Sequence, residues 1–218
     1  MKINKVCNLL AVLAFALTSA LRAELTITAS AANTVSMALQ SGAVLLGSNS
    51  RVELGYYSSA VDRALFESYT SASSFTTGWT SIATGTSNWS GYDGLFSVDT
   101  LLATGNNTLL NKQLFILVGN ASSIATSTEI AVMTNSSWLV PANPTGDIPE
   151  AYGFDILDVT TQQSGILFGS YSAGGGAYPS EGVVDAVKLQ AVVPEPSTGA
   201  LMMIGAAGLV ALRRLRKV

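Results

Sequence analysis

The chain of 218 residues has no histidine, a single cysteine and a small share of charged residues, 11%. Without histidine, a Ser-His-Asp triad, a Cys-His pair and imidazole-based zinc or haem sites are all excluded. With Cys7 alone, neither an intramolecular disulfide nor a CxxC motif can form. Charged residues make up about a quarter of an average soluble protein. These absences disfavour an enzyme, and we expect no catalytic residues, no metal and no cofactor.

The N-terminus has the layout of a secretion signal. Lys2 and Lys5 precede an apolar run over residues 6–17, and small residues follow at Ala20 and Ala23. This order of a positive, an apolar and a small-residue region is typical of a signal peptide. The run of about twelve apolar residues is also shorter than the roughly twenty that cross a bilayer. We therefore predict a signal peptide over residues 1–23, export through the Sec translocon, and cleavage after Ala20 or Ala23.

The C-terminus also divides into three parts. The first is an acidic tripeptide between prolines, Pro194, Glu195 and Pro196, which favours an extended backbone. An uncharged stretch over residues 197–212 follows, and as a helix it would span about 24 Å, slightly less than a bilayer core. The third part is a basic stop formed by Arg213, Arg214, Arg216 and Lys217. Because basic clusters stay on the cytoplasmic side, the pattern predicts a short transmembrane helix with the preceding residues outside.

These three parts, in this order, resemble the PEP-CTERM sorting signal of bacterial exosortase substrates, over residues 192–217. The resemblance implies a Gram-negative bacterium with an exopolysaccharide or biofilm locus. It also implies that a membrane exosortase, a cysteine transpeptidase-like enzyme, recognises Pro194, Glu195 and Pro196 and removes the helix. The protein would then reach the cell surface or extracellular matrix, and before processing only the helix would hold it in the membrane. An ordinary tail anchor after a proline linker is the alternative.

The region between the two signals is acidic. Residues 24–193 contain four basic and thirteen acidic residues, a net charge of −9, because most of the positive charge belongs to the signals. Nucleic acid and anionic lipid would repel such a body. It suits neutral polymers such as an exopolysaccharide, divalent cations or simple solvation.

Residues 24–191 are expected to form one all-β domain, an antiparallel β-sandwich of jelly-roll-like type. Segments rich in Val, Ile, Thr, Tyr and Phe alternate with Gly, Asn, Ser and Asp, the pattern of strands and turns. The expected strands are 25–29, 35–39, 43–46, 51–57, 113–119, 129–134, 153–158, 165–170 and 183–192. Alternation over 51–57 predicts a sheet with one wet face, and the apolar run 114–118 predicts a central strand. A short helix over 61–69 is expected to be capped by Asp62, and loops are expected over 70–111 and 174–176.

Aromatic residues in the expected loop region could stack on sugar rings. The candidate residues are Trp79, Trp89 and Tyr92, and the alternative is that they plug one end of the sandwich. Trp138 is expected in the core. Two groups of oxygen ligands, which are Asp147, Glu150, Asp155 and Asp158, or Asp93 and Asp99 with Asn106 and Asn107, could hold Ca²⁺, but solvated turns explain them better.

The sequence therefore predicts an exported, exosortase-processed protein with a structural or interaction role, linked to exopolysaccharide or biofilm. The first alternative is a carbohydrate-binding module that uses the loop aromatics. The second is a glycan-active enzyme with a pair of carboxylates, for which the spacing gives no support. The Ser/Thr-rich surface could also carry O-linked sugar.

Overall fold

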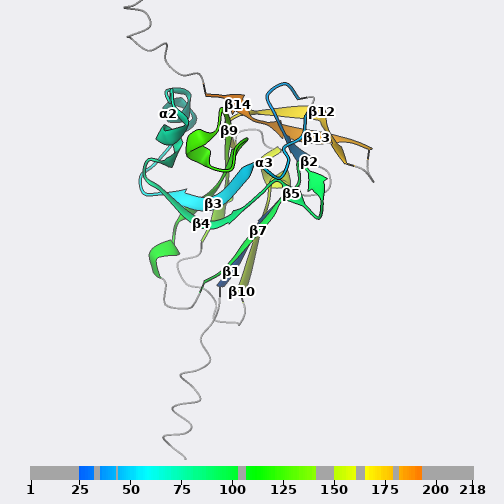
Figure 1. Cartoon of the computed structure of the whole chain (residues 1–218). Coiled ribbons are helices and arrows are strands. Elements are labelled where there is room, and N and C mark those ends of the chain that lie inside the picture. The colour runs from blue at the N-terminus through cyan, green and yellow to red at the C-terminus, as the bar shows by residue number, and fades with distance from the viewer. Residues whose placement is uncertain are drawn as a thin grey trace, which may run out of the picture.

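The computed structural model describes residues 25–31, 35–42, 44–102, 107–140, 150–160, 165–178 and 182–192, which form the body of the protein (Figure 1). The predicted signal peptide, the tripeptide 194–196, the apolar stretch 197–212 and the basic tail lie outside the described residues, as do Asn106 and Asp147. Within the described ranges, no helix is long and apolar enough to cross a membrane.

A six-stranded sheet forms the centre of the body. Its strands lie in the order β11 (Ile166–Phe168), β9 (Glu129–Leu139), β8 (Gln113–Gly119), β3 (Arg51–Tyr57) and β4 (Trp79–Gly85), and β14 (Gln190–Ala191) also pairs with β9. All pairs in this sheet are antiparallel. Strands β3 and β8 have the bounds predicted from the sequence. The apolar strand β8 is central, as predicted, because β3 and β9 flank it.

Two three-stranded sheets and a hairpin complete the β structure. Strand β1 (Leu25–Ser30) lies between β10 (Glu150–Asp155) and β7 (Ser97–Leu102), and β13 (Gly182–Lys188) lies between β12 (Ser170–Tyr178) and β2 (Val35–Ala38). Strands β5 (Asn88–Trp89) and β6 (Tyr92–Asp93) form the hairpin. The β1–β10 and β2–β13 pairs are parallel. The all-β prediction is confirmed and most pairs are antiparallel as expected, but two pairs are parallel, because late strands return to pair with the first two.

The helices within the described ranges are short. They are α2 (Arg63–Glu67), α3 (Leu157–Thr160) and three 3₁₀ turns, η1 (Ala72–Thr76), η2 (Asn107–Leu109) and η3 (Ile124–Thr126). Asp62 caps α2 as predicted, since its Oδ1 accepts a hydrogen bond of 2.8 Å from the Leu65 N–H. The helix is shorter than the predicted 61–69, because its C-terminus turns at Ser68.

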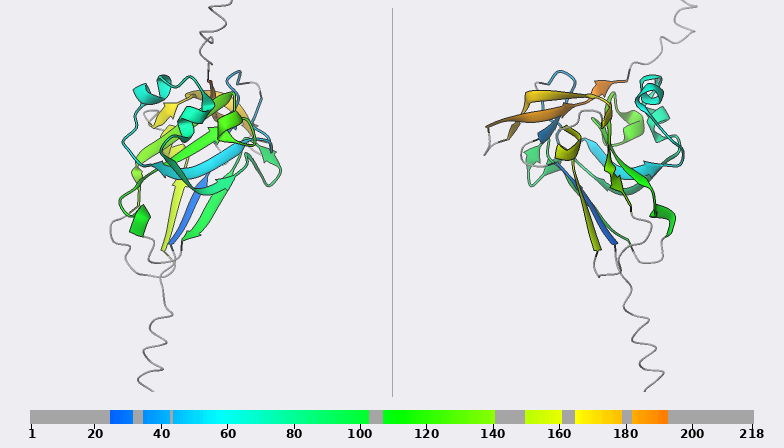
Figure 2. Two further views of the ribbon diagram at one scale, coloured as in Figure 1. Left: turned by 60° about the vertical axis from the view of Figure 1, so that its left-hand side comes forward. Right: turned by 180° about the vertical axis from the view of Figure 1, so that it is seen from behind.

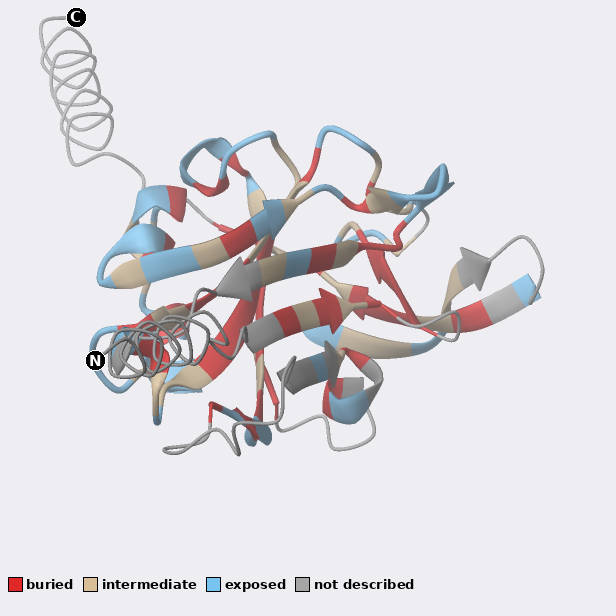
Figure 3. Cartoon of the chain, turned by 90° about the horizontal axis from the view of Figure 1, so that it is seen from below, coloured by how far each residue is buried: buried red, intermediate tan, exposed pale blue. Residues whose placement is uncertain are grey.

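The central sheet has a hydrophobic core on each face. Along β8, Leu114, Ile116 and Val118 point to one face, while Phe115 and Leu117 point to the other. The first face packs against the two smaller sheets, and we call this cluster the sheet-side core. The second face is covered by α2, η1 and η3, and we call this cluster the helix-side core (Figure 2). Buried residues accordingly concentrate on the strands (Figure 3).

The helix-side core consists largely of aromatic rings. Phe66 of α2 stacks on Phe75 of η1 with a centroid distance of 5.7 Å, and Phe75 contacts Phe168 of β11 at 4.8 Å. Tyr57 at the end of β3 donates a hydrogen bond of 2.8 Å from its hydroxyl to the Phe75 carbonyl. Burial raises the pKa of the Tyr57 phenol far above its usual value, and the charges near it, on Tyr69 and Glu53, act in the same direction. This face therefore joins sheet and helices through rings and one buried hydroxyl.

Several local predictions are corrected. On the face of β3 that was expected to contact solvent, only Arg51 and Glu53 are partly exposed, because the helix-side core covers Tyr57. Residues 70–111 contain η1, β4, β5, β6 and β7 in addition to loops, and residues 174–176 belong to β12. Strand β10 ends at Asp155, and α3 follows where the strand was expected to continue. In the described part of 43–46, only Leu45 forms a bridge, with Ala38.

Candidate functional site

The last described residue of the body, Val192, is the residue at which the C-terminal signal was predicted to begin. Strand β14 pairs with the start of β9, with Gln190 opposite Ile130 and Ala191 opposite Glu129. The N–H of Val192 then donates a hydrogen bond of 2.9 Å to the Thr128 carbonyl. The Val192 side chain is buried in the helix-side core. The chain is therefore fixed up to Val192, two residues before Pro194.

The segment that accepts the hydrogen bond from Val192 is the turn between β8 and β9, and several hydrogen bonds within the turn stabilise it. Asn120 Oδ1 accepts hydrogen bonds from the N–H groups of Thr128 (2.9 Å) and Glu129 (3.1 Å). Ser127 Oγ donates to the Ser123 carbonyl at 2.9 Å and accepts from the Ala121 N–H at 3.2 Å. Ile124 of η3 is buried in the helix-side core. These bonds hold the turn in one conformation. The chain leaves the body beside this turn, at Val192.

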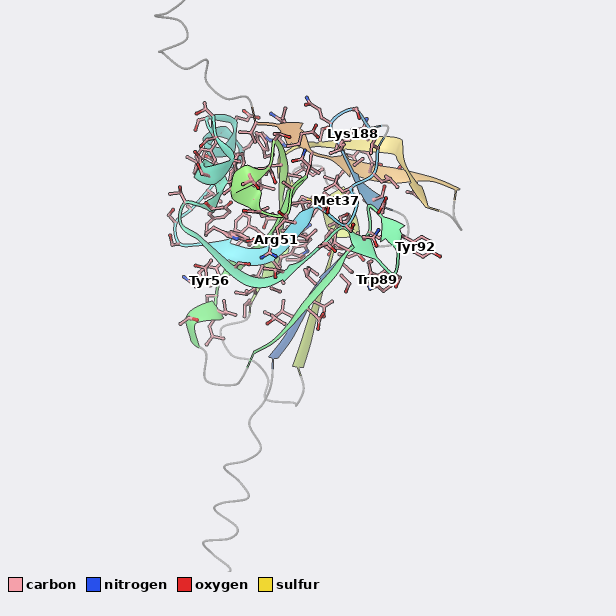
Figure 4. All side chains as sticks on the ribbon, viewed as in Figure 1. Met37, Arg51, Tyr56, Trp89, Tyr92 and Lys188 are labelled. Carbon is pink, nitrogen blue, oxygen red and sulfur yellow. The ribbon has the colours of Figure 1, made fainter. Side chains whose placement is uncertain are left out.

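Two of the predicted sugar-stacking residues lie together on the β5–β6 hairpin. Trp89 and Tyr92 are directly opposite each other and are 47% and 39% exposed. The turn between them has positive φ at Ser90 (54°) and Gly91 (84°), the mirror-image turn that matches the twist of a two-residue hairpin. Both rings extend from the body beside each other, away from the centre of the sheet (Figure 4). Two of the three candidate residues are therefore exposed and adjacent to each other.

The other side of the hairpin borders a groove of about 310 Å³. Directly opposite residues share a face, so Asn88 and Asp93 lie on the side away from the two rings. Their side chains are hydrogen-bonded at 2.5 Å. The groove is lined by Leu39, residues 44–50, Asp93 and Asn120. Its wall therefore combines apolar side chains such as Val44 with hydroxyl, amide and carboxylate groups, and the sequence analysis did not predict this groove.

Trp79 does not join this pair. It begins β4, whereas the hairpin follows the other end of that strand, about 20 Å away for seven extended residues. Its indole N–H donates a hydrogen bond of 2.8 Å to Glu53 Oε2, and its ring lies 4.9 Å from the Tyr57 ring. Arg51 in turn pairs with Glu53 at 3.0 Å. Trp79 therefore closes the edge of the helix-side core, which corresponds to the plug that the sequence left as the alternative.

Three of the carboxylates that were candidates for calcium, Asp93, Asp155 and Asp158, accept hydrogen bonds from other side chains. Trp138, 1% exposed as expected for a core residue, donates its indole N–H to Asp158 Oδ2 at 3.2 Å. Ser30 Oγ donates to Asp155 Oδ2 at 3.5 Å. Asp99 is exposed on β7. In the described ranges, no three acidic or cysteine side chains gather where they could hold a metal ion.

The sequence analysis missed one carboxylate contact. On the β12–β13 hairpin, Tyr171 donates its hydroxyl to Asp185 Oδ2 at 2.5 Å, and the Gly174 N–H donates to Oδ1 at 3.0 Å. The hydrogen bond from Tyr171 is the main cause that lowers the pKa of Asp185 below its usual value, and the bond from Gly174 is the second. The Tyr171–Asp185 bond also raises the pKa of Tyr171. The two side chains are far apart in sequence, so only the strand pairing brings them together.

Comparison with known families identifies the C-terminal segment. The model of the PEP-CTERM protein-sorting motif matches residues 192–217. No curated protein and no solved structure matches the chain. The chain therefore carries a PEP-CTERM signal at its C-terminus, which marks an exported protein recognised by exosortase and sent to the cell envelope or surface. The match begins at Val192, the last described residue of the body.

Proposed function

We propose that the protein is exported through the Sec translocon, cut by exosortase and released to the cell surface or extracellular matrix, where the body has a structural or interaction role linked to exopolysaccharide or biofilm. The observation that carries the proposal is the sorting motif over residues 192–217, directly after the folded body. The absence of histidine and the structural roles of Asp155 and Asp158 favour such a role over catalysis. The acidic body suits neutral polymers rather than nucleic acid.

The test is processing of the full chain in a host that carries exosortase. Glu195 is the only charge of the tripeptide, and a positive pocket could use it to fix the register of the peptide. We expect Glu195→Ala and Pro194→Ala to leave the uncleaved precursor in the inner membrane. Glu67→Ala, at an exposed acidic residue of α2, is the matched control and should be processed normally. Normal processing of both tripeptide variants would contradict the proposal.

The exposed pair on the β5–β6 hairpin favours a second candidate function, binding of a neutral polysaccharide. Trp89 and Tyr92 offer two neighbouring aromatic faces, and the apolar face of a hexopyranose ring packs well on such surfaces. Their exposure in a rigid hairpin distinguishes them from Trp79, which is engaged with Glu53 and Tyr57.

A glycan array probed with the mature protein tests this second candidate. We expect binding to neutral hexose polymers, and a loss of at least about tenfold in affinity for Trp89→Ala, since stacked aromatics are typical hot spots. Thr84→Ala, at an exposed position of β4, is the control. Equal binding by Trp89→Ala and wild type would exclude the hairpin, and no binding to any hexose polymer would exclude the function.

A further inference from the structure

We propose that the exposed residues of the β8–β9 turn form the face that contacts exosortase during cleavage. These residues, which we call the exit face, are Ser122, Ser123, Ala125, Thr126 and Thr128. The proposal rests on the proposed function above and adds the part of the body that the processing enzyme touches.

The first argument is the short reach of the chain beyond Val192. Its backbone is bonded to Thr128 of the exit face, and its side chain is buried. An extended chain advances at most about 3.5 Å per residue, so Pro194 lies within about 7 Å of Val192. A membrane enzyme is far larger than this distance. It can bind the tripeptide only by lying against the body beside Val192.

The second argument is the composition of the exit face. Residues 119–128 contain no charged side chain, although the body as a whole has a net charge of −9. The acidic residue that follows this segment in the sequence, Glu129, is half-buried, and its Oε2 accepts a hydrogen bond of 2.7 Å from the Gln40 N–H. Small hydroxyl and methyl groups are far cheaper to desolvate against a partner than charges are. The face next to the exit is therefore fit for contact with a protein surface.

The third argument is rigidity. The bonds from Asn120 and Ser127 fix the turn, and Ile124 anchors it in the helix-side core. In Figure 1, η3 lies beside β9 and β14, close to the end of the described chain. A preformed surface loses little conformational entropy when a partner binds it. The exit face thus combines position, neutral chemistry and order, and all three favour contact with the enzyme that cuts the chain there.

The experiment measures the rate of precursor cleavage by pulse-chase of the full chain in an exosortase-carrying host. Ala125 is exposed, so Ala125→Glu and Ala125→Lys can be made without disturbing the core. We expect both to slow cleavage at least about fivefold, because either charge would be desolvated without a partner. Thr84→Glu and Thr84→Lys, on the exposed side of β4, are matched controls and should be cleaved at the wild-type rate.

A second variant tests the reach argument independently. A flexible Gly-Ser insertion directly after Val192 should restore the wild-type rate to both Ala125 variants, since the enzyme no longer has to lie against the body. Equal rates for wild type and both variants would overturn the proposal while leaving exosortase processing intact. Slower cleavage with Glu but faster cleavage with Lys would overturn it in favour of contact with anionic lipid. A wild-type chain that stays full-length would overturn both this inference and the proposed function.

Discussion

The two faces of the central sheet are built differently. The sheet-side core joins three sheets mainly through aliphatic side chains on strands, such as Val52, Ile116 and Val187. The helix-side core joins the sheet to helices of three to five residues through rings such as Phe66 and Phe75. Helices this short are not stable alone, so their place depends on the rings. We therefore expect the sheet-side core to contribute most of the stability of the fold. Because Val192 is buried on the second face, the helix-side core fixes the position at which the chain leaves the body.

The largest expected effect tests the sheet-side core. Ile116 is completely buried at the middle of β8, between β3 and β9. Ile116→Ala should lower the free energy of unfolding by about 4 kcal/mol, through lost burial and the cavity left behind. Urea unfolding of the purified mature protein measures this loss. A loss close to that of the surface control Thr84→Ala would show that this face does not carry the fold.

A smaller effect is expected on the helix-side core. Tyr57→Phe leaves the ring but removes the hydroxyl that bonds the Phe75 carbonyl, which then stays buried without a partner. The loss should be about 1.5 kcal/mol. Amide hydrogen exchange should rise in η1 and at Val192 more than in β8, because the bond ties η1 to the sheet. A uniform rise over all three segments would remove the distinction between the two faces.

Alkaline titration tests the burial of Tyr57 in a second way. Burial raises the pKa of Tyr57, so its phenol should stay protonated at pH values above the usual tyrosine pKa of about 10. Since the folded state holds the proton more tightly than the unfolded state, Tyr57 favours folding below pH 10 and ceases to do so at higher pH. The tyrosinate absorbance of the folded protein at pH 11 should therefore be the same in wild type and Tyr57→Phe.

The parts of the fold that local patterns determine were predictable from the sequence. Alternation and β-branched residues placed β3 and β8, and Asp62 identified the start of α2. The sorting signal was readable for the same reason, since its residues are contiguous, and the family comparison confirms the motif over residues 192–217. The sequence indicated only part of the aromatic arrangement. The hairpin places Trp89 and Tyr92 together, but Trp79 lies apart from them and is hydrogen-bonded to Glu53.

The features of the fold that the sequence did not predict depend on pairing between segments that are distant in the chain. Serine and threonine are common in loops, so β4 and β7 were hidden in a region that reads as irregular. The run 174–176 reads as a flexible loop, yet a Cβ at Gly176 would lie only 2.0 Å from Ser36 Oγ, and Gly174 has a φ of 62°. These glycines permit close packing and a bulge inside β12 rather than flexibility. The exit face likewise lies beside Val192 only because β14 returns to pair with β9.

The smallest expected effect lies at the edge of the sheet-side core, on the β12–β13 hairpin, which extends from the body in Figure 1. Asp185 is two residues from Val187 of the sheet-side core, and its carboxylate accepts hydrogen bonds from the exposed Gly174 N–H and from Tyr171, whose ring packs against the edge of that core. Because these contacts lower its pKa, the ionised carboxylate favours folding above its unfolded value of 3.8, and this contribution is lost as the pH falls through the lower folded value.

Carboxyl chemical shifts of the folded protein, followed by NMR as a function of pH, measure this contact directly. The midpoint of Asp185 should lie below 3.8 in wild type and should rise toward that value in Tyr171→Phe, since the hydrogen bond from Tyr171 is the main cause of the shift. Tyr92→Phe, on the other hairpin, is the control and should leave the midpoint unchanged. The amides of Ile116 and Val192 should show no transition at this midpoint, because solvent screens an exposed pair. A transition at either amide would mean that the hairpin is coupled to the cores on the two faces of the central sheet.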